Sequence, residues 1–134
     1  TIGKNNKGFH WKIGIDKPMI GTVPGEQIYS VVSVSNQAMA TSGNYRNFKE
    51  YDNVPYSHII NPRTGRPTQS NIASVTVVAP NCMDADALAT ALNVMEVEEG
   101  LELVESLDGF EAFWIIKENE EWRSVPSSGM PIAN

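Results

Sequence analysis

The stretch that decides the fold reads Asn81-Cys82-Met83-Asp84-Ala85-Asp86-Ala87-Leu88-Ala89-Thr90-Ala91-Leu92. It follows, after Pro80, the most continuous apolar run of the 134-residue chain, residues 72–79. Pro80 cannot continue a central strand, and Asn81 or Asp84 can cap the first turn of a helix. We therefore predict a buried central strand from Ile72 to Ala79 and then a helix from about Asp84 to Met95.

The predicted helix has an apolar face and a polar face. The apolar residues at helical spacing, which we expect to face a core, are Leu88, Ala91, Leu92 and Met95. Asp86 and Thr90 are four residues apart and therefore share the roughly opposite face. A carboxylate and a hydroxyl placed in this way supply the hard oxygen ligands that Mg²⁺ prefers. On spacing alone, a solvated polar face on an Ala-rich helix remains the simpler interpretation.

Composition limits the kinds of partner. A hydrophobic fraction of 41% is enough for a real core, and the length corresponds to at most one ordinary domain. The net charge is −6 and no basic block is present, which argues against nucleic acid as a partner. A dinucleotide would need local help from a metal ion, a few basic side chains or backbone N–H groups. The single cysteine excludes an internal disulfide.

The remaining elements point to a mixed fold. Alternating and β-branched residues predict strands at 10–15 and 28–34 and hairpins at 45–60 and 111–125. Ser42-Gly43-Asn44 has the composition of a turn, and Val97 to Leu107 is predicted to form a second helix. Because strands outnumber helices and most connections look like hairpins, we predict an α+β fold. It has a largely antiparallel sheet with two adjacent helices packed on one face.

Two further blocks give this helix its context. They are Ala40-Thr41-Ser42-Gly43-Asn44-Tyr45 and Ser57-His58-Ile59-Ile60-Asn61-Pro62-Arg63-Thr64-Gly65. In this order and spacing, followed by residues 74–80 and the Ala85-Asp86-Ala87-Leu88-Ala89-Thr90 block, the chain resembles the ApbE family. Its members are flavin transferases that were once described as thiamine-biosynthesis lipoproteins. The resemblance runs from about Gly3 to about Leu107.

The resemblance implies a longer protein. Residues 1–134 would be the C-terminal part of a single ApbE-like domain, and its N-terminal part would precede Thr1. That preceding part would carry the lipoprotein signal that is usual in the family. The complete protein is therefore expected to be a membrane-anchored lipoprotein on the extracytoplasmic side of the bacterial cell envelope.

The activity implied by the resemblance is that of a Mg²⁺-dependent FAD:protein FMN transferase. Such an enzyme moves FMN from its substrate FAD to a Thr or Ser hydroxyl of an acceptor protein and releases AMP. Two alternatives stay open: hydrolysis of FAD to FMN and AMP, and a flavin-binding module without activity. Because the family takes another metal ligand from the part before Thr1, these 134 residues alone are expected to hold an incomplete site.

The resemblance also assigns roles to single residues. His58 matches the family's active-site histidine, and an imidazole can take up a proton near neutral pH. Asp86 and Thr90 match metal ligands, which a backbone carbonyl near Ala89 would join. The expected flavin or phosphate contacts are Ser42, Gly43, His58, Ile59, Thr64 and Gly65.

The chain departs from the family pattern at two asparagines. The family often carries Asp where this chain has Asn44 and Asn61. Both changes remove a charge but keep the size and much of the hydrogen-bonding capacity of the side chain. They leave the fold prediction intact and affect only the local hydrogen bonding expected near the site.

Overall fold

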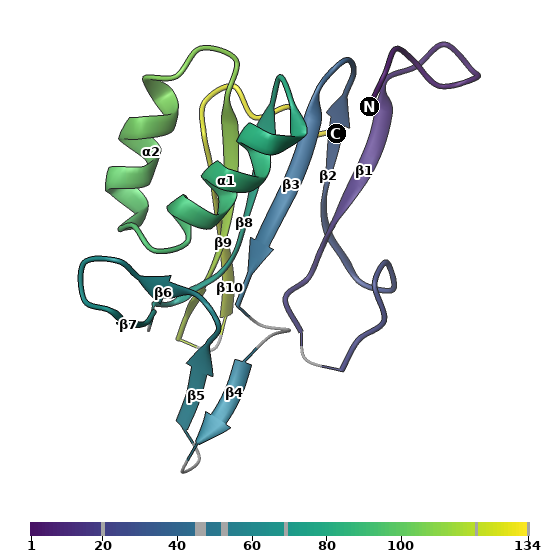
Figure 1. Ribbon diagram of the computed structural model, residues 1–134. Coiled ribbons are helices and arrows are strands. Elements are labelled where there is room, and N and C mark those ends of the chain that lie inside the picture. Colours follow the sequence, from purple (N-terminus) through teal and green to yellow (C-terminus); the bar gives the residue numbers. More distant parts are fainter. Residues whose placement is uncertain (20, 45–47, 52–53, 69, 120, 134) are drawn as a thin grey trace.

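A four-stranded antiparallel sheet forms the centre of the molecule in the computed structural model (Figure 1). The structure describes residues 1–19, 21–44, 48–51, 54–68, 70–119 and 121–133. The strand order is β10–β9–β8–β3, with bounds Glu121–Pro126, Glu111–Glu118, Ile72–Ala79 and Ala38–Gly43. The predicted antiparallel sheet is therefore confirmed.

Strand β8 is the central strand that the sequence predicts. All eight of its residues are buried, and it pairs with β3 on one side and β9 on the other. A strand that is covered on both faces reads as a continuous apolar run rather than as an alternating one. Because β8 is buried on both faces, its apolar run in the sequence has the same bounds as the strand itself, Ile72–Ala79.

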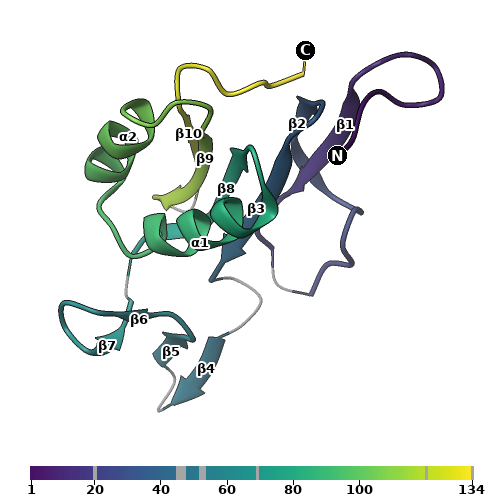
Figure 2. The same cartoon turned by 45° about the horizontal axis from the view of Figure 1, so that its top comes forward.

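Two helices cover one face of the sheet (Figure 2). Helix α1 spans Cys82–Leu92 and helix α2 spans Val97–Glu105. The side-chain oxygen of Asn81 accepts the backbone N–H of Asp84 at 3.0 Å and so caps α1. These helices and β8 and β9 enclose one hydrophobic core, in which Trp114 is fully buried. The predicted placement of two helices on one face is confirmed.

The sequence misjudged details of both helices. Helix α1 ends at Leu92 rather than near Met95, and α2 ends at Glu105 rather than Leu107. Ala91, which we expected in the core, is exposed. The buried residues of α1 are Ala85, Ala89 and Leu92, at i, i+4 and i+7. Because Ala91 lies about 100° around the helix from Leu92, the stripe that faces the sheet does not include it.

A second, two-stranded sheet packs against the other face. Strands β1 (Trp11–Asp16) and β2 (Ile28–Val34) pair antiparallel. Their inward side chains share a second core with residues of β8, β9 and the C-terminal segment: Ile15, Val32, Val34, Val78, Phe113, Ile115 and Met130. The backbone N–H of Ala133 donates to Val31 O at 2.8 Å, so the C-terminal segment runs along β2. The four-stranded sheet thus lies between helices and a hairpin.

Two small hairpins extend from one end of the central sheet, at the bottom of Figure 1. Strands β4 (Phe48–Tyr51) and β5 (Val54–Ser57) form one, and β6 (Ile60–Asn61) and β7 (Arg66–Pro67) form the other. Strands β4 and β5 confirm the predicted 45–60 hairpin, but its second strand ends at Ser57 rather than at Ile60. Residues 45–47 and 52–53 lie outside the described part.

The predicted turn at 42–44 is wrong. Ser42 and Gly43 complete β3, opposite Val75 and Ser74 of β8, and the chain bends only at Asn44. Pairing with a long buried strand overrides the local turn preference of serine and glycine.

Candidate functional site

The carboxylate and hydroxyl of the predicted metal pair lie on one exposed face of α1. Asp86 and Thr90 are both exposed, and the Thr90 hydroxyl donates to the backbone carbonyl of Asp86 at 3.1 Å. This hydrogen bond uses the proton of the hydroxyl and leaves lone pairs on its oxygen. The polar face predicted from the four-residue spacing is therefore present, and the Thr90 hydroxyl shares it with the Asp86 carboxylate.

Ala89 lies on the inward side of the same helix. Its side chain is fully buried in the core beneath α1, so it can contribute to a site only through its backbone carbonyl. Among the described residues, no group of three or more His, Cys, Asp or Glu side chains could hold a metal ion. Two oxygen donors on one helix do not fit the closed tetrahedral sites of zinc. They do fit Mg²⁺, which uses few protein oxygens and keeps waters or phosphate oxygens.

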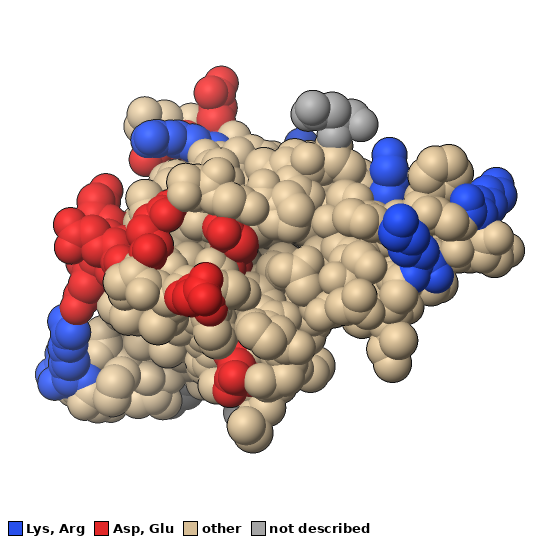
Figure 3. Space-filling view, turned by 90° about the horizontal axis from the view of Figure 1, so that it is seen from above, with Lys and Arg blue, Asp and Glu red and all other residues tan. Residues whose placement is uncertain are grey.

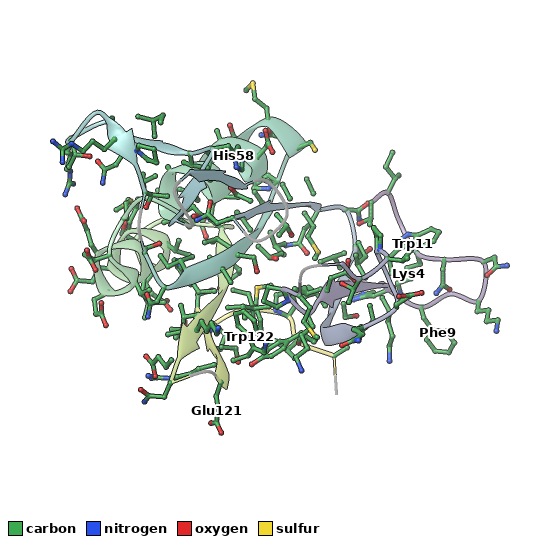
Figure 4. All side chains as sticks on the ribbon, turned by 90° about the horizontal axis from the view of Figure 1, so that it is seen from below. Lys4, Phe9, Trp11, His58, Glu121 and Trp122 are labelled. Atoms are coloured by element: carbon green, nitrogen blue, oxygen red, sulfur yellow. The ribbon has the colours of Figure 1, made fainter. Side chains whose placement is uncertain are left out.

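His58 lies in the bend between β5 and β6 and is exposed, whereas Ile59 beside it is 7% exposed. The Ser57 hydroxyl oxygen accepts the backbone N–H of Ile59 at 3.0 Å and so bridges the backbone across His58. Figure 4 shows His58 far from the N-terminal segment that bears Lys4, Phe9 and Trp11. The histidine is thus held on an ordered bend with its side chain accessible from solvent.

The loop between β6 and β7 is ordered by Asn61. Its side-chain oxygen accepts Arg63 N–H at 2.8 Å, and its carbonyl accepts Gly65 N–H at 2.8 Å. Gly65 has φ of 67°, which is in the left-handed region that favours glycine. Thr64 and Gly65 are exposed at the tip of this loop. Both predicted contacts are accessible and their backbone is fixed.

The hairpin of β6 and β7 carries Arg63 and Arg66 and lies beside the acidic helix α2. Arg63 pairs with Glu99 of α2 at 2.9 Å, so the loop is tied to that helix. Figure 3 shows acidic side chains gathered over the side of the molecule that carries α2, and a group of basic side chains at the opposite end. An anionic ligand at α1 would therefore gain little from the surrounding field and would need a cation.

The residue that sequence reasoning missed is Asn93, the C-cap of α1, which is 0% exposed. Its side-chain Nδ2 donates to Ser42 O at 3.1 Å, and its Oδ1 accepts Asn44 Nδ2 at 2.6 Å. Asn44 Oδ1 in turn accepts the Ser57 hydroxyl at 2.7 Å. In sequence Asn93 looks like an ordinary helix end, and only its complete burial marks it out.

These hydrogen bonds bring the predicted segments together. The end of β3 with Ser42 and Gly43, the C-terminal end of α1, and the residue before His58 meet around Asn44 and Asn93. The structure thus joins three blocks that are separate in the sequence.

Comparison with known proteins decides the family. The family model described as "ApbE family" matches residues 1–114. The chain belongs to the ApbE family. An FAD:protein FMN transferase of Vibrio cholerae is 40% identical over 126 residues, which are 94% of this chain and 36% of that protein. Its counterpart in Escherichia coli is 38% identical over 122 residues, which are 91% of this chain and 34% of that protein.

Solved ApbE structures share the fold. The flavin transferase ApbE from Vibrio cholerae matches with a TM-score of 0.75 at 39% identity, over 94% of this chain and 38% of that one. The ApbE protein from Thermotoga maritima matches with a TM-score of 0.77 at 29% identity, over the same shares. The chain spans about a third of the length of the curated relatives that it matches.

Proposed function

We propose that this chain is part of a Mg²⁺-dependent FAD:protein FMN transferase, which moves FMN from FAD to a Thr or Ser hydroxyl of an acceptor protein. The observation that carries the proposal is the hydrogen-bonded cluster around Asn44 and Asn93, which joins two sequence blocks of the ApbE resemblance to the end of the helix that carries the third. The names of the relatives, which are FAD:protein FMN transferases, support the same reaction.

In the proposed reaction, the acceptor oxygen forms a bond to the phosphorus of the FMN moiety. The pyrophosphate bond to AMP breaks, and AMP leaves with the bonding electrons. The hydroxyl proton of the acceptor passes to the imidazole of His58, which is exposed and fixed on its bend by Ser57. A positioned base of this kind contributes about a hundredfold to ten-thousandfold in rate.

Asp86 and Thr90 would hold Mg²⁺, together with a carbonyl near Ala89 and a ligand from elsewhere in the complete protein. When bound, the ion would neutralise the charge of the two phosphates and of the leaving AMP. The exposed backbones of Thr64 and Gly65, and the half-buried Ser42 and Gly43, are the proposed contacts of the flavin or phosphate groups. Ile59, being buried, would act by fixing the bend next to His58.

A second candidate function is hydrolysis of FAD, with water in place of the acceptor hydroxyl. The exposure of His58 favours it, because water reaches an exposed imidazole without a conformational change. Both reactions release AMP, but only the transferase leaves FMN bound covalently to protein. A flavin-binding module without activity is the third alternative, and the presence of His58, Asp86 and Thr90 together argues against it.

The experiment uses the complete protein with FAD and an acceptor peptide that contains Thr and Ser. We expect AMP release and covalent flavin on the peptide with Mg²⁺, and neither with a chelator. Asp86→Ala should lower the rate by more than a hundredfold, because several kcal/mol of charge stabilisation depend on the metal. The matched control is Asp84→Asn on the same helix. The carboxylate of Asp84 accepts a hydrogen bond from Asn81 Nδ2 at 2.7 Å. Full activity of Asp86→Ala would remove the metal assignment.

We further propose that the complete protein is a lipoprotein anchored on the extracytoplasmic face of the bacterial envelope. The support is the family resemblance alone. Within the described residues, neither helix has the length and apolar character to cross a bilayer. Fractionation of cells, with protease added to intact spheroplasts, tests the proposal; recovery of the protein in the cytosolic fraction would contradict it.

A further inference from the structure

We infer that Asn93 is a positioning residue for His58, which it reaches through Asn44 and Ser57. The inference rests on the proposed function, in which His58 takes the acceptor proton while Asp86 and Thr90 of α1 hold the metal. Such a reaction requires the base and the metal-bearing helix to keep a fixed separation, although they lie on different elements. The chain of hydrogen bonds from Asn93 to Ser57 supplies a physical connection between them.

The connection begins inside the protein. Asn93 is 0% exposed, and both polar atoms of its side chain are used, with Nδ2 on Ser42 O and Oδ1 on Asn44 Nδ2. The bond to Asn44, at 2.6 Å, is short for a nitrogen–oxygen pair. A buried side chain that makes bonds in two directions has one orientation, because rotation would break both. Asn93 therefore fixes Asn44 relative to the C-terminal end of α1.

The connection then passes to the bend of His58. Asn44 is itself held on the sheet, since its backbone N–H donates to Ala73 O at 2.9 Å. Its Oδ1 accepts the Ser57 hydroxyl at 2.7 Å, and the oxygen of that hydroxyl accepts Ile59 N–H at 3.0 Å. Ser57 and Ile59 are the two chain neighbours of His58, so their hydrogen bond sets the direction in which the histidine leaves the backbone.

The position of the hairpin makes this link consequential. Strands β4 and β5 form a two-stranded sheet of their own, and do not belong to the four-stranded sheet that carries α1. Ser57, the last residue of β5, is therefore a point where the hairpin is fastened to the core. If Asn93 no longer holds the side chain of Asn44, this side chain can turn, and the hairpin and His58 can shift while α1 stays packed on the sheet. A misplacement of about 1 Å is enough to cost on the order of a hundredfold in rate.

The test compares Asn93→Ala with Asn81→Ala in the complete protein. Asn81 caps the other end of the same helix, so its loss lowers stability without touching the connection. For Asn93→Ala we expect kcat for AMP release to fall about tenfold to a hundredfold with little change in KM for FAD. For Asn81→Ala we expect kcat within about twofold of wild type. If Asn93→Ala does not fold, Asn93→Leu takes its place in the test, because it leaves a smaller cavity than Asn93→Ala.

A second readout does not depend on activity. The ring ¹H–¹³C signals of His58, assigned with His58→Gln, and the hydrogen-exchange rate of the Ile59 amide should change in Asn93→Ala and in Ser57→Ala. Both should stay at their wild-type values in Asn81→Ala. The double variant with Asn93→Ala and Ser57→Ala should lose no more kcat than the more severe of the two single variants, because both substitutions break the same chain of hydrogen bonds.

The outcomes separate the inference from the proposed function. Absence of AMP release from the wild-type protein would overturn the transferase proposal. Wild-type His58 and Ile59 signals in Asn93→Ala would overturn the positioning role alone. Equal losses of kcat in Asn93→Ala and Asn81→Ala, or additive losses in the double variant, would also overturn it, since they would show an effect through stability only.

Discussion

Substitution of Asn44 by aspartate tests the hydrogen-bond assignment at the centre of the site. The amide Nδ2 of Asn44 donates to Asn93 Oδ1 at 2.6 Å and to Ile72 O at 3.4 Å, while its Oδ1 accepts the Ser57 hydroxyl. In Asn44→Asp the donor becomes a second carboxylate oxygen, which faces two acceptors. If the Asn93 amide turns around to donate to the new carboxylate, its oxygen then faces Ser42 O instead. Every arrangement leaves one buried pair of acceptors in contact.

The magnitude follows from these contacts. A buried acceptor that loses its donor costs about 1–3 kcal/mol, and the long bond to Ile72 O adds little. The hydroxyl of Ser57 donating to a carboxylate gains roughly 1 kcal/mol over the neutral bond. We therefore expect Asn44→Asp to lower the free energy of unfolding by about 1–2 kcal/mol at neutral pH. Toward pH of about 4 the difference should shrink, because a protonated carboxyl can again donate to Asn93 Oδ1.

The assay is urea unfolding of wild type and variant at several pH values, and the second asparagine provides the control. Asn61 Oδ1 accepts Arg63 N–H, which a carboxylate can do equally well, so Asn61→Asp should stay within about 0.5 kcal/mol of wild type. The reasoning is refuted if Asn44→Asp is as stable as wild type at neutral pH. A loss that does not vary with pH, or an equal loss in Asn61→Asp, would refute it as well.

Two further predictions concern packing and pH. Leu92 is 0% exposed, so Leu92→Ala should lower the free energy of unfolding by about 3–5 kcal/mol. Met83, on the same helix, is 76% exposed, so Met83→Ala should change it by less than about 0.5 kcal/mol. Urea unfolding measures both variants, and similar losses would contradict the packing. The hydroxyl and the backbone N–H of Ser128 each hydrogen-bond the carboxylate of Glu105 and hold its pKa below the ordinary value. This contribution to stability is present above the ordinary pKa of a glutamate and is lost as pH falls through the lowered pKa of Glu105. Acidification should therefore lower the thermal stability of Glu105→Gln less than that of wild type. Identical dependence of thermal unfolding on pH in the two proteins would contradict the prediction.

Periodicity predicted the fold class but not every boundary. The central strand, both helices and the closing hairpin are visible in the sequence because burial imposes a continuous or helical apolar pattern. Ser42 and Gly43 were misread as a turn because their strand structure comes from pairing with Val75 and Ser74, more than thirty residues away. Ala91 was misread because the orientation of α1 is set by its contact with the sheet.

The candidate site divides in the same way. Asp86 and Thr90 share a face by helical geometry alone, so their spacing was sufficient to pair them. His58 was singled out by the motif that contains it, but its bend was not, because residues 45–60 were predicted to form a hairpin with His58 in its second strand. Asn93 gave no such signal, because an asparagine after a helix is common and its importance comes from complete burial.

The sequence by itself determined most of the elements, their order and the family, because those depend on local periodicity and on motifs that are contiguous in the chain. The tertiary structure alone decided which motifs meet. The connection from Asn93 through Asn44 to Ser57 joins residues 49 and 13 positions apart in the sequence. No local pattern encodes such contacts, since they exist only where buried polar atoms of different elements must satisfy one another.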